Sequence, residues 1–176
     1  MNYLLTGEET ERLTFRLLYE DDYDTWLPFF DGPNVAKFLL LDPSLSKKDL
    51  CDKWFEKCMM RYDKKLGGMN VLIEKTSGEF IGHCGLLIQT IEDVDYLEVG
   101  YSILPKFWGK GYASEAAIKC KNFTFENNYR DSLISIIHKE NIGSRKVAIN
   151  NGMTLYKNNL KSPNQDFEMY RINKAK

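Results

Sequence analysis

FWGKGYAS, residues 107–114, stands between a stretch typical of a strand and a stretch typical of a helix. The strand pattern covers residues 97–104 and stops at Pro105, and Gly109 and Gly111 follow it. Small and apolar side chains then recur at the spacing of one helix face, at Ala113, Ala116, Ala117, Cys120 and Phe123. A glycine turn before a helix start aims several backbone N–H groups at one spot, with the helix dipole behind them. The stretch therefore predicts a loop that binds a pyrophosphate. A tight strand-to-helix connection without a ligand fits the two glycines alone equally well.

Two features of the loop favour the ligand. Gly111, Ala113 and Ser114 are small, so the first helical turn is unobstructed, and Lys106 and Lys110 give the turn a charge that suits a phosphate. Glycine also allows a large anion to approach closely and adopts positive φ without strain.

The well-known nucleotide-binding loops match this stretch poorly. A P-loop has a longer spacing between its glycines and a Lys-Ser/Thr pair, which are both missing here. A dinucleotide-binding turn would have a third glycine where Ser114 stands and an acid at the end of the next strand. Asp131 precedes the expected strand at residues 132–137 instead of ending it. A nucleotide-dependent oxidoreductase is therefore disfavoured.

The segment WGKGYASEA, which begins at Trp108, resembles the acetyl-coenzyme A signature of the GNAT N-acetyltransferases. Gly111 and Ala113 fill the last two positions of the superfamily pattern Gln/Arg-x-x-Gly-x-Gly/Ala. Trp108 replaces the Gln/Arg, as is usual in the RimJ/RimL-like branch, which is similar to ribosomal-protein N-terminal acetyltransferases. The resemblance implies that acetyl-CoA binds along the loop, at Trp108, Gly109, Lys110, Gly111, Tyr112, Ala113 and Ser114.

A second segment, residues 141–153, resembles the Asn-x-x-Ser helix of the same family and the Asn-Gly turn that follows it. The resemblance implies that Asn141 forms a hydrogen bond with the cofactor and that Ser144 faces it. Asn141 is also well placed to be a helix N-cap, and both roles can hold at once. Arg145 and Lys146 fit solvated surface charges better than phosphate ligands.

The family geometry implies that the strand ending at Leu104 and the strand starting at Ser132 diverge. Pantetheine would fill the gap and pair with main-chain groups of Ser102, Ile103 and Leu104, much as an added strand does. The backbone N–H of Ile103 would polarise the thioester carbonyl and hold the oxyanion. The acceptor amine would attack directly, so no protein nucleophile is needed.

The amine must lose its proton, and Glu98 on the central strand is the candidate general base, directly or through water. An exposed or salt-bridged glutamate is the competing interpretation. The leaving thiolate needs an acid, for which Ser144 is the candidate, with Tyr101 and Tyr156 as alternatives. His83 and His138 fit structural roles better than catalytic ones and form no metal set with the cysteines.

The composition of the chain excludes several classes of protein. The chain has 176 residues, of which 43% are hydrophobic and 28% charged, as expected for one domain spanning residues 1–176. Its net charge of −1 provides no general basic surface for nucleic acid, and no apolar run is long enough to cross a membrane. The acidic N-terminus differs from a signal peptide, and the four cysteines show no CxxC pair, so we expect a reducing cytoplasm.

The order of expected elements matches the GNAT topology nearly throughout. The fold class is α+β: a mixed, mostly antiparallel twisted sheet of about seven strands with about four helices. Expected strands cover residues 11–18, 69–74, 80–88, 97–104, 132–137, 154–159 and 166–173. Expected helices cover residues 21–30, 46–61, the segment after Gly111 and 141–150, with a helical turn at 34–40 and an acidic turn at 92–95.

These observations favour an acetyl-CoA-dependent N-acetyltransferase, without a metal, that modifies a primary amine on a protein N-terminus or a small molecule. The alternative is a coenzyme A-binding sensor or interaction module without catalysis. The oligomeric state stays open, a homodimer included. Residues 21–41, the helix at 46–61 and the closing hairpin would shape the acceptor site. Aromatic and acidic side chains there fit a cationic acceptor or a helix packed on the sheet equally well; they are Tyr23, Trp26, Phe29, Phe30 and Asp31.

Overall fold

The computed structural model describes residues 3–161 and 165–175 and contains one seven-stranded sheet. The spatial order is β1-β2-β3-β4-β5-β7-β6, and every neighbouring pair is antiparallel except β4 and β5. The strands are β1 (Leu13–Arg16), β2 (Gly67–Glu74), β3 (Phe80–Ile91), β4 (Val94–Ile103), β5 (Ser132–His138), β6 (Thr154–Lys157) and β7 (Phe167–Asn173). The predicted mixed, mostly antiparallel sheet is confirmed.

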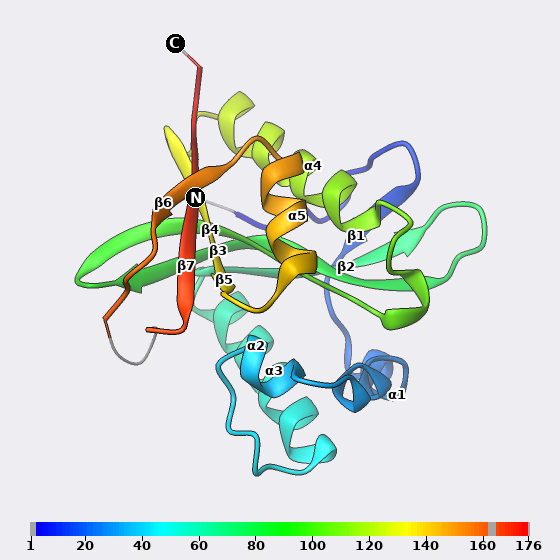
Figure 1. Ribbon diagram of the computed structural model, residues 1–176. Coiled ribbons are helices and arrows are strands. Elements are labelled where there is room, and N and C mark those ends of the chain that lie inside the picture. Colours follow the sequence, from blue (N-terminus) through cyan, green and yellow to red (C-terminus); the bar gives the residue numbers. More distant parts are fainter. Residues whose placement is uncertain (1–2, 162–164, 176) are drawn as a thin grey trace.

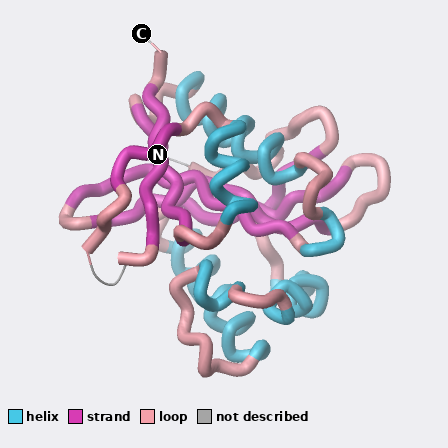
Figure 2. The backbone as a smooth tube through the Cα atoms, viewed as in Figure 1, coloured by secondary structure: helices cyan, strands magenta, loops and turns pink. Residues whose placement is uncertain are grey.

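Helices cover the sheet on two sides, as Figures 1 and 2 show. The helices α4 (Tyr112–Glu126) and α5 (Ile142–Asn150) lie over one face, and α1 (Tyr23–Trp26), α2 (Val35–Phe38) and α3 (Lys47–Asp63) lie over the other. The glycine turn after β4 leads into α4, and the end of β5 leads into α5.

The helix α3 begins as predicted. Ser46 accepts a hydrogen bond from the backbone N–H of Asp49, and the Asp49 carboxylate reaches back to Ser46, which together form a capping box. Its inner side is buried at Leu50, Cys51, Phe55, Cys58 and Arg61, so the two cysteines serve packing.

The single helix expected over residues 21–30 is wrong in detail. The segment consists of a 3-10 turn at Glu20–Asp22, the short helix α1 and a second 3-10 turn at Leu27–Asp31. Pro28 lies at the start of this last turn, and because its nitrogen carries no hydrogen, it cannot continue the α-helical bonding pattern.

The acidic turn expected over residues 92–95 is also too long. The register pairs Ile91 with Val94, so only Glu92 and Asp93 form the turn and β4 begins at Val94. Both turn residues have positive φ, 52° and 62°, which matches the right-handed twist of a two-residue hairpin. Neither residue is glycine, and the usual sequence signal for such a turn is therefore missing.

The parallel strands β4 and β5 pair at a single rung, where Glu98 lies opposite Ile134. By contrast, β3 and β4 stay paired from the Ile91–Val94 turn to Gly82 and Ile103. We call the space between β4 and β5 beyond this rung the β4–β5 gap. Its presence agrees with the divergence that the family resemblance implies.

The core fills both sides of the sheet. Trp26 is fully buried and stacks on Phe29 at 4.2 Å between ring centroids, which supports the packing interpretation of the aromatic side chains near residue 26. Within the described residues, no helix combines the length and the apolar character that a membrane crossing demands.

Candidate functional site

The glycine loop, residues 107–114, carries main-chain groups that are free to meet a ligand. Gly109 and Gly111 have φ of +75° and +84°, in the left-handed region that glycine adopts without strain. Gly111 is the N-cap of α4 and has no side chain to cap the first turn. A Cβ built on Gly109 would have no heavy atom within 4 Å, so the space beside this glycine is open. Together these features form a helix N-terminus suited to an anion.

Arg12 and Glu115 hold the glycine loop from behind. Glu115 lies in the first turn of α4 and accepts hydrogen bonds from the Arg12 backbone N–H at 2.9 Å and from its Nε at 2.7 Å. Arg12 also donates from Nη1 to the Lys110 carbonyl at 3.0 Å and lies over the Tyr112 ring. These bonds fix the loop to the segment before β1. They also place the Arg12 guanidinium against Glu115, the acidic residue in the first turn of α4.

Charge near the glycine loop is balanced by these contacts. Partial burial alone would raise the pKa of Glu115, but hydrogen bonds from Thr10 and Arg12 outweigh it and hold that pKa below its ordinary value. Lys106 pairs with Glu79 at 2.9 Å, and both Lys106 and Lys110 lie over the Phe107 ring. No local sequence pattern indicates the contact between Arg12 and Glu115, because it joins positions 103 residues apart.

The end of β4 presents one residue to the β4–β5 gap. The N–H of Leu104 donates to Ile81 in β3, and because successive residues of a strand alternate, the main-chain groups of Ile103 point away from β3. The carbonyl of Ile103 accepts a hydrogen bond from the Trp108 indole at 2.6 Å. Ser102 lies opposite His83 of β3. Ile103 therefore offers its N–H toward the gap, whereas the Leu104 N–H is engaged within the sheet.

Glu98 lies at the closed end of the gap. It is 9% exposed, and its carboxylate accepts hydrogen bonds from Gln89 Nε2 at 2.8 Å and from the Ile136 N–H at 3.2 Å. Burial raises the pKa of Glu98, against the opposing effect of these hydrogen bonds. Ile103 lies five residues further along β4, about 16 Å at roughly 3.3 Å per residue, so the two predicted catalytic groups do not touch.

The start of α5 faces the helix side of the same gap. Asn141 accepts a hydrogen bond from the Ser144 N–H at 3.0 Å, which confirms its N-cap role. The Tyr101 hydroxyl donates to the Ser144 carbonyl at 2.7 Å, and burial raises the pKa of Tyr101 well above its ordinary value. Ser114 accepts a hydrogen bond from Asn150, so α4 and α5 are linked beside the glycine loop. Tyr156 lies on β6 and is 46% exposed.

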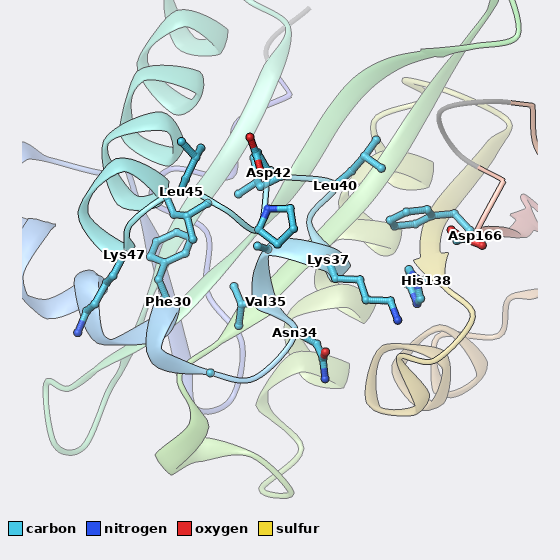
Figure 3. A pocket seen from close by; sticks show the side chains of 16 residues that line it. Phe30, Asn34, Val35, Lys37, Leu40, Asp42, Leu45, Lys47, His138 and Asp166 are labelled. Carbon is cyan, nitrogen blue, oxygen red and sulfur yellow. The ribbon is translucent and has the colours of Figure 1, made fainter.

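On the opposite side of the sheet, an apolar cavity of about 760 Å³ lies between α2, the start of α3 and the ends of β5 and β7 (Figure 3). Most of its lining is aliphatic or aromatic, and the side chains that contribute are Phe30, Val35, Ala36, Leu40, Leu41, Pro43, Leu45, Leu50 and Phe167. Asn34, Lys37, Asp42, Lys47, His138 and Asp166 supply the polar part. The cavity draws on the segments expected to shape the acceptor site, and its lining includes His138, for which a structural role was the preferred interpretation.

His83 takes no part in the cavity lining. It is fully buried against Trp26, with ring centroids 4.2 Å apart, and burial lowers its pKa to about 3. Neither ring nitrogen has a hydrogen-bond partner among the described residues. The preference for a structural role at this position agrees with the packing. Among residues 3–161 and 165–175, no group of three or more His, Cys, Asp or Glu side chains is arranged to hold a metal ion.

The sheet order and the diverging parallel pair define an α+β fold that solved acetyltransferases share. A structure of an acetyltransferase from Agrobacterium tumefaciens strain C58 superposes with a TM-score of 0.80 at 24% identity, covering 99% of this chain and 98% of that one. A structure of RimL, a ribosomal L7/L12 α-N-protein acetyltransferase in complex with coenzyme A, has a TM-score of 0.71 at 17% identity, covering 96% and 97%.

The chain belongs to the GNAT acetyltransferase family, since the family model described as an acetyltransferase (GNAT) domain matches residues 12–154. The protein YkkB of Bacillus subtilis strain 168 is 29% identical over 163 residues, which cover 92% of each chain. The N-acetyltransferase p20 of Bacillus licheniformis is 30% identical over 141 residues, 78% of this chain and 76% of that one. This protein is accordingly an N-acetyltransferase that uses acetyl-CoA.

Proposed function

We propose that this enzyme transfers the acetyl group of acetyl-CoA to a primary amine by direct attack of the amine on the thioester. The observation that supports this proposal most strongly is the uncapped first turn of α4, which lies beside a gap between parallel strands. That turn is suited to an anion, and the neighbouring strand end has a backbone N–H that is not used by β3.

The coenzyme would bind with its pyrophosphate at the amides of residues 109–114 and its pantetheine arm in the β4–β5 gap. Trp108, Lys110 and the first turn of α4 would surround the phosphates, since phosphate oxygens accept hydrogen bonds from such amides. The arm would pair with the main chain near Ile103, and Asn141 and Ser144 would line its other side. Trp108 in place of Gln/Arg supports a position in the RimJ/RimL-like branch.

The chemistry requires an oxyanion donor, a base and an acid. The Ile103 N–H would hold the carbonyl oxygen of the thioester as negative charge develops on it. Glu98 would accept the amine proton through water along the gap, and its raised pKa moves it toward the value at which a base works best near neutral pH. The amine nitrogen bonds to the acetyl carbon and the carbon–sulfur bond breaks. Ser144 would donate a proton to the thiolate and take one from solvent water in its place.

Binding and turnover can be tested separately. Acetyl-CoA at one hundred times its Kd should add about 2.7 kcal/mol to the free energy of unfolding, whereas NAD and ATP should leave the melting temperature unchanged. Thiol release from acetyl-CoA with a panel of amines then reports catalysis. A melting shift with no thiol release for any amine would favour the coenzyme-binding module instead of the enzyme.

A further inference from the structure

The apolar cavity contains one polar side chain that is held firmly inside it. His138 is the last residue of β5 and is 4% exposed. Its ring lies between Phe38 and Phe167, at 5.4 and 5.1 Å between centroids. Two aromatic contacts from different segments leave the imidazole little freedom to turn, so its polar edge keeps a fixed direction.

The tautomer of His138 follows from its neighbour. Nδ1 accepts a hydrogen bond from the backbone N–H of Glu140 at 3.1 Å. A ring nitrogen that accepts a hydrogen bond carries no hydrogen, so the neutral ring bears its hydrogen on Nε2. His138 is therefore a hydrogen-bond donor in the cavity (Figure 3), and it cannot remove a proton from an amine in this form.

The position of His138 links the cavity to the β4–β5 gap. Glu98 pairs with Ile134, and four residues further along each parallel strand come Ser102 and His138. His138 and Ser102 therefore hold equivalent positions on the two diverging strands, on opposite sides of the β4–β5 gap. A molecule bound in the cavity with its amine toward the gap would meet the thioester at the proposed oxyanion donor.

Lys37, Lys47 and Asp42 of the cavity lining are engaged with neighbours, and Asp166 adds a second carboxylate. Lys37 pairs with Glu140 at 2.8 Å, and Lys47 pairs with Asp31 at 2.5 Å. Asp42 accepts hydrogen bonds from the backbone and the hydroxyl of Ser44. Two lysines and two carboxylates give the cavity no strong field of one sign, so its apolar shape and the His138 donor are left to select the acceptor.

We propose that the apolar cavity selects primary amines with a bulky apolar group and an adjacent carbonyl, and that His138 Nε2–H donates to this carbonyl. Amino-acid amides and peptide N-termini with a large apolar first residue belong to this class. The inference rests on the proposed acetyl transfer to an amine. Within it, His138 is a binding residue that touches the acceptor.

A matched pair of amines tests the proposal. L-phenylalaninamide and 2-phenylethylamine share the apolar body and the amine, and only the first has the carbonyl. With kcat/KM expressed per concentration of unprotonated amine, because an α-amine and an alkyl amine are protonated to different extents at neutral pH, the wild-type enzyme should favour L-phenylalaninamide by about ten-fold, the factor that one net hydrogen bond of roughly 1.4 kcal/mol supplies. Spermidine, which is polycationic and lacks a bulky apolar group, should be the weakest acceptor.

His138→Phe removes the donor and keeps an aromatic ring. It should abolish the preference between the two amines by raising KM for L-phenylalaninamide more than KM for 2-phenylethylamine, while KM for acetyl-CoA stays unchanged. His138→Gln, which keeps an N–H donor, should restore part of the preference, and it serves if His138→Phe does not fold. Ile149→Glu on the exposed side of α5 is the control and should change neither amine.

Each remaining outcome has a definite meaning. An unchanged preference in His138→Phe would overturn the role of His138, and faster turnover of spermidine than of both aromatic amines would overturn the acceptor class. Calorimetric titration of both aromatic amines in the presence of coenzyme A covers the case without turnover. Binding of L-phenylalaninamide without acetyl transfer would contradict only the proposed function, whereas no binding of either amine would overturn the acceptor assignment.

Discussion

The glycine loop and the apolar cavity lie at opposite sides of the β4–β5 gap and are built differently. The loop offers the main-chain amides of residues 109–114, while the Trp108 indole donates to the Ile103 carbonyl and the Tyr112 ring lies against Arg12. The cavity uses side chains from α2, α3, β5 and β7, which are distant in sequence. The contrast teaches that main-chain groups can bind a cosubstrate that a whole family shares, because they do not depend on side-chain identity. An acceptor that differs between enzymes is instead selected by side chains, which can be substituted without changing the fold.

The largest effect is expected at Glu98, between the two regions. Glu98→Gln keeps the shape of the side chain and one acceptor oxygen but cannot accept the amine proton, so kcat should fall by about a hundred-fold. KM for acetyl-CoA should not change. A kcat within a few-fold of wild type would remove Glu98 from the mechanism and leave water or another group as the base.

The same variant has a pH-dependent effect on stability. Burial raises the pKa of Glu98 above 4.5, so the favourable contribution of its neutral form is complete below about pH 4.5 and is lost as pH rises through the raised pKa. Glu98→Gln should therefore be more stable than wild type at neutral pH, with the difference vanishing below pH 4.5. Urea unfolding at pH 7 and pH 4 measures this change, and equal differences at both pH values would contradict it.

The next effect is expected in the glycine loop and has a matched control. Gly109 and Gly78 have nearly equal positive φ, +75° and +71°, and neither would place a Cβ within 4 Å of another atom. Gly109→Val and Gly78→Val should therefore lose similar stability, about 1–2 kcal/mol each. Only Gly109→Val should weaken acetyl-CoA binding, by on the order of a hundred-fold, because the valine side chain would occupy the space of the pyrophosphate. Equal coenzyme affinity in both variants would show that the loop is only a connection.

A smaller effect is expected behind the loop. Arg12→Ala removes the cation that pairs with the Glu115 carboxylate. The unpaired carboxylate would then repel the phosphates of acetyl-CoA, so KM for acetyl-CoA should rise by about ten-fold. Arg12→Ala combined with Glu115→Gln should recover part of this loss, because the repelling charge is gone. Steady-state kinetics with a fixed amine concentration measures both variants, and a further loss in the double variant would mean that Glu115 acts only as a mechanical support.

The smallest effect is expected in the cavity wall. Leu45→Ala removes part of one half-buried apolar side chain, so KM for aromatic amines should rise by about three- to five-fold, the effect of roughly 1 kcal/mol of apolar burial. KM for acetyl-CoA should stay constant. Together with Gly109→Val, this variant separates the two regions, and a rise of both KM values in either variant would show that they are coupled.

The two regions also differ in how far the sequence predicts them. The glycine loop is a local pattern, in which a strand, two glycines and a helix start follow each other within twenty residues, and both its helix start and its divergent strand pair were expected. The cavity has no local pattern, because Leu50, His138 and Phe167 come together only after the sheet has formed. The sequence pattern places His138 at the end of a strand, but nothing in it indicates that the His138 ring packs beside Phe38.

The misplaced elements have local causes. Pro28 divides the helical segment before residue 31, although the apolar spacing continues through it. Glu92 and Asp93 adopt positive φ without glycine, so the sequence gives no sign that β4 begins at Val94. In both cases side-chain patterns were a poor guide to backbone geometry, which is set there by a missing N–H or by strand twist.

The single rung between Glu98 and Ile134 also affects how the molecule holds together. The sheet consists of two leaves, β1–β4 and β5–β7–β6, that share one main-chain pairing and are otherwise joined by side chains and helices. A coenzyme arm lying between the leaves would act as a removable eighth strand. Hydrogen exchange of the amides that border the gap should then slow strongly when the coenzyme binds, while exchange within each leaf changes little.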